Sequence, residues 1–194
     1  MTPDAGSPVS IREVGLRDGL QSIARILPTQ QKIEWIADAY AAGQRKIEVG
    51  SFVPARLLPQ LADTAELVTY AKTLPGLTVS VLVPNLKGAQ RAFDTGAHAL
   101  LVPLSASHAH SLANLRKTPD DVVREIERIR AARDAAGSAC RIEVGMSTAF
   151  GCTMQGEVPE DDVVRIAAAL AGFCDHVSLA DTVGYANPAQ IRRM

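Results

Sequence analysis

Short apolar runs alternate with longer helical patterns along the whole chain, and this alternation constrains the fold more than any other feature. The runs are rich in Val, Ile and Leu and have the length of buried strands. Between the first two runs, apolar side chains recur with the spacing of a helix packed on a sheet, at Ile33, Ile36, Ala37, Tyr40 and Ala41. Strands joined by helices pair in parallel, because the chain must cross back before the next strand. The pattern therefore predicts an α/β fold with a parallel sheet.

Six strands are predicted, over residues 9–14, 46–49, 78–83, 99–102, 141–145 and 176–179. The helix after the first strand ends near Gly43, and further helices are predicted at 61–72, 86–95, 119–136 and 159–171, each ending shortly before a glycine. Strands recur about every 33 residues, so eight units would need roughly 260, close to the size of a (β/α)₈ barrel. Six strands could also form an open doubly wound sheet, although Gly15 and Gly19 alone do not make a dinucleotide-binding fingerprint. Periodicity leaves both architectures open.

Composition favours one domain with a small-molecule ligand. With 194 residues, 47% of them hydrophobic, the chain can bury a sizeable core, which we place at residues 9–194 after a flexible tail at 1–8. A net charge of −1 with scattered Lys and Arg predicts no nucleic-acid partner and no membrane partner. Three cysteines without a CxxC pair argue against a disulfide framework and a structural zinc site. With no signal-like leader and no membrane-length apolar run, we expect a cytoplasmic protein.

Three predicted strands end in the same tripeptide, Glu-Val-Gly, at residues 13–15, 48–50 and 143–145. A carboxylate just before the end of a strand is expected near the C-terminal rim of the sheet, and the glycine lets the backbone turn away. Ligands bind at this rim in parallel α/β folds. For any single glutamate, a role as a salt-bridge partner at the rim is an equally good interpretation.

Arg17 and Asp18 are adjacent opposite charges directly after the first predicted strand. A carboxylate here can ligate a hard divalent cation, and a guanidinium can stabilise a developing oxyanion. An internal salt bridge that tightens the turn between Gly15 and Gly19 explains the same residues if the stretch is considered alone.

The stretch does not stand alone. Five segments follow one another, each at a predicted strand end: EVGLRDGLQ, KIEVGSFVPARLLPQ, VLVPNLKG, STAFGC and VSLADTVGYANP. From about Val9 to the last residue, the chain resembles the 3-hydroxy-3-methylglutaryl-CoA lyase family of metal-dependent TIM-barrel lyases. The first segment would also suit the related Claisen synthases, whereas SFVPARLLPQ and PNLKG resemble the lyase branch. The resemblance implies a (β/α)₈ TIM barrel of which this chain supplies about six βα units, the N-terminal two thirds.

The resemblance also implies roles for residues at the strand ends. Asp18 would be a ligand of Mg²⁺ or Mn²⁺, and Arg17 would neutralise the enolate oxygen of acetyl-CoA as the C–C bond breaks. Glu48 would handle a proton or orient Arg17, and Asp181 would act near the metal-bound oxygens of the substrate. The implied substrate-binding residues are Gln21 and Ser51 in the acyl pocket, Asn85 and Lys87 on the CoA side, and Ser178 and Thr182 at the sixth strand. Lys87 is equally well interpreted as a solvated charge at a helix start.

The implied reaction cleaves 3-hydroxy-3-methylglutaryl-CoA to acetoacetate and acetyl-CoA. The family takes its other metal ligands from a His-x-His on the seventh strand and an Asn on the eighth, and its catalytic cysteine from a later Gly-rich loop, all expected beyond Met194. His108 and His110 imitate this motif, but we expect a surface loop there without a metal. Cys152 and Cys174 are interpreted as structural thiols.

Three functions remain open at this stage. The first is the lyase, which we expect to be a homodimer when full length. The second is a related Claisen-type synthase, or a lyase for another 3-hydroxyacyl-CoA thioester. The third is a catalytically inactive scaffold that keeps half of the acyl-CoA site. Because an unclosed sheet leaves two bare edge strands, we expect the 194-residue chain to be a fragment that is prone to aggregate or is completed by another chain.

Overall fold

The structure is a computed structural model, and it describes residues 9–194. Five parallel strands form one sheet in the order β1-β2-β3-β4-β5. Their bounds are Lys46–Ser51, Thr78–Leu82, Ala99–Ser105, Arg141–Ser147 and His176–Leu179. A doubly wound sheet reverses its strand order at a switch point, whereas strands of a barrel follow one another. The sequential order therefore decides for the barrel, which periodicity had left undecided.

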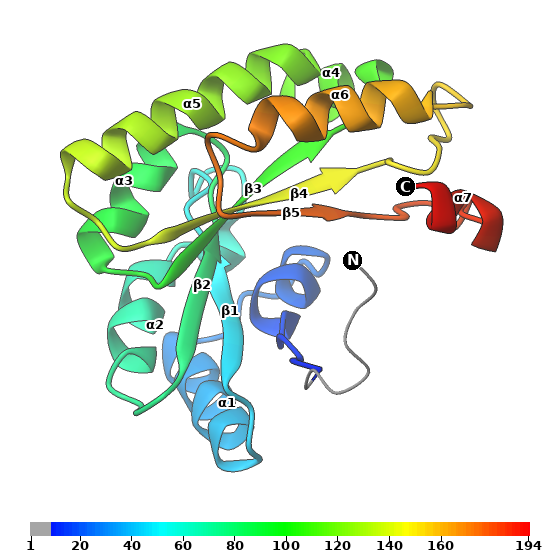
Figure 1. The fold of residues 1–194 in the computed structure, drawn as a ribbon. Helices are drawn as coiled ribbons and strands as arrows, with labels where there is room; N and C mark the ends of the chain where they lie inside the picture. Colours follow the sequence, from blue (N-terminus) through cyan, green and yellow to red (C-terminus); the bar gives the residue numbers. More distant parts are fainter. Residues whose placement is uncertain (1–8) are drawn as a thin grey trace.

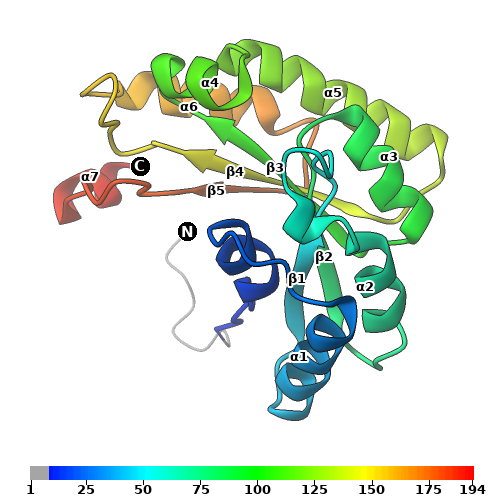
Figure 2. The ribbon, with the colours of Figure 1, turned by 180° about the vertical axis from the view of Figure 1, so that it is seen from behind.

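Helices cover the convex side of the curved sheet, and the N-terminal segment that includes residues 15–19 lies on the concave side (Figure 1, Figure 2). The covering helices are α1 Thr29–Ala41, α2 Thr64–Ala71, α3 Leu86–Thr95, α5 Pro119–Ala135 and α6 Glu160–Leu170. Shorter elements lie in the loops: the π-helix η1 Gly15–Gly19, the 3₁₀ turn η2 Pro59–Leu61, α4 His108–Leu115 and α7 Pro188–Arg193. None of the described helices combines the length and apolar content needed to cross a membrane.

The strands alternate between an apolar convex face and a polar concave face. The convex side chains are at most 1% exposed and pack under the helices: Ile47, Val49, Val79, Val81, Leu100, Val102, Leu104, Ile142, Val144 and Met146. In the register of the sheet, Glu48 pairs with Ser80, and Glu143 with His176 on the next strand. These polar residues share the other face, because successive side chains point to opposite sides of a strand. The core thus lies between sheet and helices, and the concave side carries charge.

The prediction of a strand at residues 9–14 is wrong. Only Glu13 joins the sheet: its N–H donates to the Lys46 carbonyl at 2.9 Å, and its carbonyl accepts from the Glu48 N–H at 2.8 Å. The turn into η1 begins at once, and Val9 and Ile11 are 92% and 72% exposed. The segment has a neighbour on one side only, and one isolated bridge does not make a ladder. The described residues therefore supply five strands and a bridge, not six strands.

The prediction of a flexible loop around His108 and His110 is also wrong. This stretch forms α4, whose first turn is capped by Ser107: its Oγ accepts a hydrogen bond from the His110 N–H. Small polar residues favour a loop here, but the Ser107 side chain supplies the cap that lets a helix begin. The predicted tail at 1–8 lies outside the described residues.

Candidate active site

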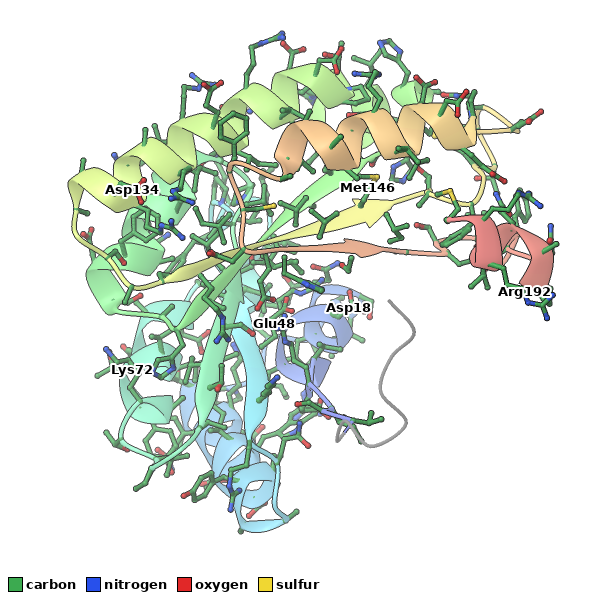
Figure 3. All side chains as sticks on the ribbon, viewed as in Figure 1. Asp18, Glu48, Lys72, Asp134, Met146 and Arg192 are labelled. Carbon is green, nitrogen blue, oxygen red and sulfur yellow. The ribbon has the colours of Figure 1, made fainter. Side chains whose placement is uncertain are left out.

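The candidate site begins at η1, which leads from the Glu13 bridge across the C-terminal end of β1. Gly15 is needed at its start, because a Cβ there would stand 2.6 Å from Glu13 Oε1 and 2.8 Å from the Trp35 ring. The tight turn places Arg17 and Asp18 beside the end of β1. In Figure 3 the labelled Asp18 and Glu48 lie next to each other at this point.

Arg17 is held by three oxygen-bearing side chains. Its Nε donates to the carboxylate of Glu48, and its Nη1 donates to Asp18 Oδ1 at 2.8 Å and to Gln21 Oε1 at 3.5 Å. The side chains of Arg17 and Glu48 are 12% and 1% exposed, whereas that of Asp18 is 59% exposed. A planar guanidinium bound on two edges has a fixed orientation. The structure thus brings together four predicted site residues, with Glu48 buried beneath and Asp18 facing solvent.

Two opposing effects act on the pKa of the buried Glu48 carboxylate. Burial raises its pKa above the ordinary value of 4.5, while the positive charges of Arg17 and Arg12 lower it. The net direction is upward, so burial outweighs the ion pair. This arrangement can orient Arg17, and it favours a proton on Glu48 more than an exposed glutamate would.

Ser51 and Asn85 lie at the ends of β1 and β2 with their polar atoms already bonded. The Ser51 hydroxyl donates to the Leu82 carbonyl at 3.1 Å and accepts from the Val53 N–H at 3.2 Å. Asn85 caps α3, where its Oδ1 accepts from the Gly88 N–H at 3.0 Å. These contacts give both residues a structural role at the rim, and their predicted contact with substrate stays a prediction.

Lys87 lines a small cavity of about 190 Å³ next to the end of β1. Its walls include Phe52, Asn85 and Arg91, and the Arg91 guanidinium lies 4.5 Å from the centre of the Phe52 ring. Two cations and an aromatic face beside a rim loop suit an anionic, ring-containing ligand. The geometry is compatible with the predicted CoA side.

The β5 end of the rim is organised by its own hydrogen bonds. Asp181 accepts the N–H groups of Tyr185 and Ala186 at 2.9 and 3.2 Å, and Thr182 Oγ1 accepts the Thr148 N–H at 2.7 Å. Ser178 Oγ donates to the Val144 carbonyl at 3.4 Å. Within residues 9–194, no hydrogen bond or ion pair joins these side chains to Arg17 or Asp18. The two ends of the predicted pocket are thus both at the rim but are not in direct contact.

Comparison with known proteins agrees with this architecture. The HMGL-like family model matches residues 8–194, which is almost the whole chain. The chain belongs to the HMGL-like family. Its similar relatives include the hydroxymethylglutaryl-CoA lyase of Bacillus subtilis, 35% identical over 94% of this chain and 61% of the relative. Another is the 3-hydroxy-3-isohexenylglutaryl-CoA/hydroxymethylglutaryl-CoA lyase of Pseudomonas aeruginosa, 36% identical over 96% and 62%.

Solved structures give the same assignment. The crystal structure of the B. subtilis HMG-CoA lyase superposes with a TM-score of 0.87 at 34% identity, covering 95% of this chain and 62% of that one. An Acinetobacter baumannii HMG-CoA lyase, solved with coenzyme A and 3-methylmalate, has a TM-score of 0.84 at 33% identity, over 95% and 60%. The predicted barrel family is therefore confirmed, and this chain spans about 60% of the length of these relatives.

HMGL-like enzymes are generally dependent on a divalent metal, and we tested whether this chain can hold one. Asp18 offers an exposed carboxylate, one oxygen of which already accepts from Arg17. Across residues 9–194, no three His, Cys, Asp or Glu side chains are grouped as metal ligands would be. A hard cation needs about six oxygen or nitrogen ligands. The described residues by themselves therefore do not fit a metal ion.

Some contacts in this HMGL-like chain were not foreseen from the sequence. Arg12 donates to Glu143 Oε2 at 2.6 Å, from the segment before η1 to β4. His110 Nδ1 lies 2.7 Å from Ser105 Oγ, so this ring is joined to the end of β3. Thr148, fully buried, has a left-handed backbone with φ +57°. The Arg12–Glu143 pair spans 131 residues, so no local pattern signals it.

Proposed function

We propose that this chain is the substrate-binding and oxyanion-stabilising part of a lyase that cleaves 3-hydroxy-3-methylglutaryl-CoA to acetoacetate and acetyl-CoA. The observation that carries the proposal is the fixed orientation of Arg17 above buried Glu48 at the rim of an HMGL-like barrel. The names of the relatives from B. subtilis and P. aeruginosa support the same substrate class.

In the cleavage, the electron pair of the C2–C3 bond stays with C2. Transfer of the tertiary hydroxyl proton to a base, for which Glu48 and Asp181 are the candidates, lets the C2–C3 bond break, and the electron pair of that bond becomes the enolate of the acetyl-CoA thioester. Arg17 would donate a hydrogen bond to that enolate oxygen, because its guanidinium is already oriented by Glu48 and Gln21. A proton then adds at C2, and acetoacetate is the other product.

The remaining predicted residues take supporting roles in this proposal. Ser51, Asn85 and Lys87 would line the substrate channel along β1 and β2. Ser178, Asp181 and Thr182 would close it from the β5 end, with Asp181 as the catalytic candidate on that side. Asp18 would contribute one ligand to an Mg²⁺ or Mn²⁺ ion whose other ligands come from outside the described residues.

An assay for acetoacetate release tests the function. The full-length protein, supplied with Mg²⁺ or Mn²⁺, is expected to release acetoacetate and acetyl-CoA in equal amounts from 3-hydroxy-3-methylglutaryl-CoA. Absence of both products, with substrate binding retained, would favour the inactive scaffold. Condensation of acetyl-CoA with an oxo acid would favour the Claisen-type synthase.

The same assay should also be run with 3-hydroxy-3-isohexenylglutaryl-CoA, because the P. aeruginosa relative is named for this thioester as well. A higher kcat/KM for that thioester would reassign the acyl specificity and leave the reaction unchanged. We further propose that the full-length protein is a cytoplasmic homodimer, which sedimentation and cell fractionation can check.

A further inference from the structure

A second cavity lies at the opposite end of the strands from the candidate active site. It has a volume of about 590 Å³ and is formed by the loops that lead into β2, β3 and β4. Its principal walls are Lys72, Leu77, Ala97, His98, Cys140 and Arg141. We call this cavity the basal pocket. In Figure 3 the labelled Lys72 lies well away from Asp18 and Glu48. The two sites are therefore separate.

The basal pocket is positively charged. Lys72, His98 and Arg141 line it, and no acidic side chain does. Lys72 Nζ donates to the Thr95 carbonyl at the long distance of 3.4 Å, and the carboxylate of Glu143 stands 3.9 Å from Arg141 Nε. Burial, and then the charges of Lys72 and Arg141, lower the pKa of His98. Lys72 and Arg141 are thus both near enough to act on the His98 ring, and the ion pair of Arg141 with Glu143 is a long one.

The donors of the pocket are also oriented. His98 Nδ1 accepts a hydrogen bond from the Val79 N–H at 3.0 Å, so the proton of the neutral ring is on Nε2. The Lys72 ammonium lies over Gly96, where a Cβ would stand 2.3 Å from Nζ. Gly96 therefore provides the space that the ammonium occupies. Below these groups, Leu77, Ala97 and Cys140 are buried and form an apolar floor.

We propose that the basal pocket binds a small phosphate-bearing molecule, with the phosphate between Lys72, His98 and Arg141 and the carbon portion on the apolar floor. Two full positive charges and a directed N–H suit a doubly charged anion better than a single carboxylate, which needs only one cation. The proposal depends on the C-terminal end of α2 and on the loops that lead into β2, β3 and β4, and it does not rest on the proposed lyase activity.

Calorimetry with inorganic pyrophosphate tests the proposal on the full-length protein. The Lys72→Met, Arg141→Met double variant keeps an unbranched stem at both positions and removes both charges, and it is expected to weaken pyrophosphate binding at least tenfold. The matched control is Arg124→Met with Arg165→Met, which removes two exposed charges from α5 and α6. An equal loss in this control would show a general charge effect and overturn the proposal.

Two further measurements make the result specific. In NMR spectra, pyrophosphate is expected to shift the ring signals of His98 and to leave those of His108 and His110 unchanged. His98→Gln should weaken pyrophosphate binding about threefold. Because the His98 ring is neutral, this substitution removes a hydrogen-bond donor and no positive charge. If citrate bound as tightly as pyrophosphate, the pocket would not recognise phosphate and the proposal would fail. It would also fail if the wild-type protein bound neither anion.

Discussion

Arg17 shows how single residues prepare the candidate site. Its guanidinium is held by the side chains of Glu48, Asp18 and Gln21. Lysine could keep the charge at this position but could not bind these partners in one plane. The site thus depends on the shape of the cation as well as on its charge.

Replacing Arg17 should reduce turnover. In the full-length protein we expect Arg17→Lys and Arg17→Gln to lower kcat for acetoacetate release by about 10²–10³-fold, the usual loss for one oxyanion donor. Arg165→Gln on α6 is the matched control and should leave kcat unchanged. A variant of Arg17 with full kcat would remove this residue from the proposed mechanism.

Glu48 should make stability depend on pH. Because its pKa is raised in the folded chain, the unfolded chain loses this proton first as pH rises above about 4.5. The free energy of unfolding of the wild type should therefore fall relative to that of Glu48→Gln between pH 4.5 and the raised pKa. Urea denaturation of both proteins across this range measures the difference. The opposite slope would mean that the ion pair with Arg17 outweighs burial.

Gly50 lies where the fold leaves no room for a side chain. A Cβ there would meet Thr64 Oγ1 at 2.3 Å, and this oxygen also accepts from the Ser51 N–H. Gly50→Ala should lower the free energy of unfolding by about 1–3 kcal/mol through overpacking. Gly172→Ala is a control, since no atom lies within 4 Å of its added Cβ. Equal stability of the two variants would contradict the packing argument.

Among the elements, α5 has the most complete start signal. Thr118 Oγ1 accepts from the Asp121 N–H, Asp121 accepts from the Thr118 N–H, and Pro119 occupies the first turn. This capping box satisfies two backbone donors that a helix start leaves unpaired. The sequence alone therefore located the start of this helix correctly.

Removing the cap should destabilise the fold. Thr118→Ala should lower the free energy of unfolding by about 1 kcal/mol, whereas Thr69→Ala within α2 should have little effect.

The hydrogen bonds from Thr118 lower the pKa of Asp121 from 3.8 to about 2. The stabilisation from Asp121 is therefore present above pH 3.8 and is lost as pH falls towards 2. Thr118→Ala should weaken this acid dependence, and an unchanged profile in thermal melts would contradict it.

For the whole molecule, the ion pair of Arg12 with Glu143 ties the segment before η1 to β4 across the concave face. The side chains are 27% and 10% exposed, so water screens the pair only in part. Since the two residues lie 131 positions apart, their contact restrains the N-terminal segment against β4 and not a local turn.

A double-mutant cycle measures this restraint. Arg12→Met, Glu143→Gln and the combination are expected to give a coupling energy of about 1 kcal/mol in urea denaturation. The coupling should decrease in high salt to the extent that the pair is exposed. Strict additivity of the two single variants would show that the contact does not stabilise the fold.

Local sequence determined most of the helices and strands and the position of the charged pair Arg17 and Asp18. Apolar runs and glycine stops located five strands and the helices that cover them, and the order of residues after the first run placed Arg17 and Asp18 at the rim. Each of these features depends on neighbours within a few residues, so the sequence displays it directly.

Only the tertiary structure decided features that depend on distant partners. The segment at 9–14 has strand-like residues, but a strand needs a continuous neighbour, and only Glu13 meets one. The pairing of Arg17 with Glu48, the bond between Arg12 and Glu143, and the gathering of Lys72, His98 and Arg141 all join residues that are far apart in the sequence and meet only in the folded chain. Such contacts depend on which strands, helices and loops become neighbours in the fold, and no short stretch of sequence records that arrangement.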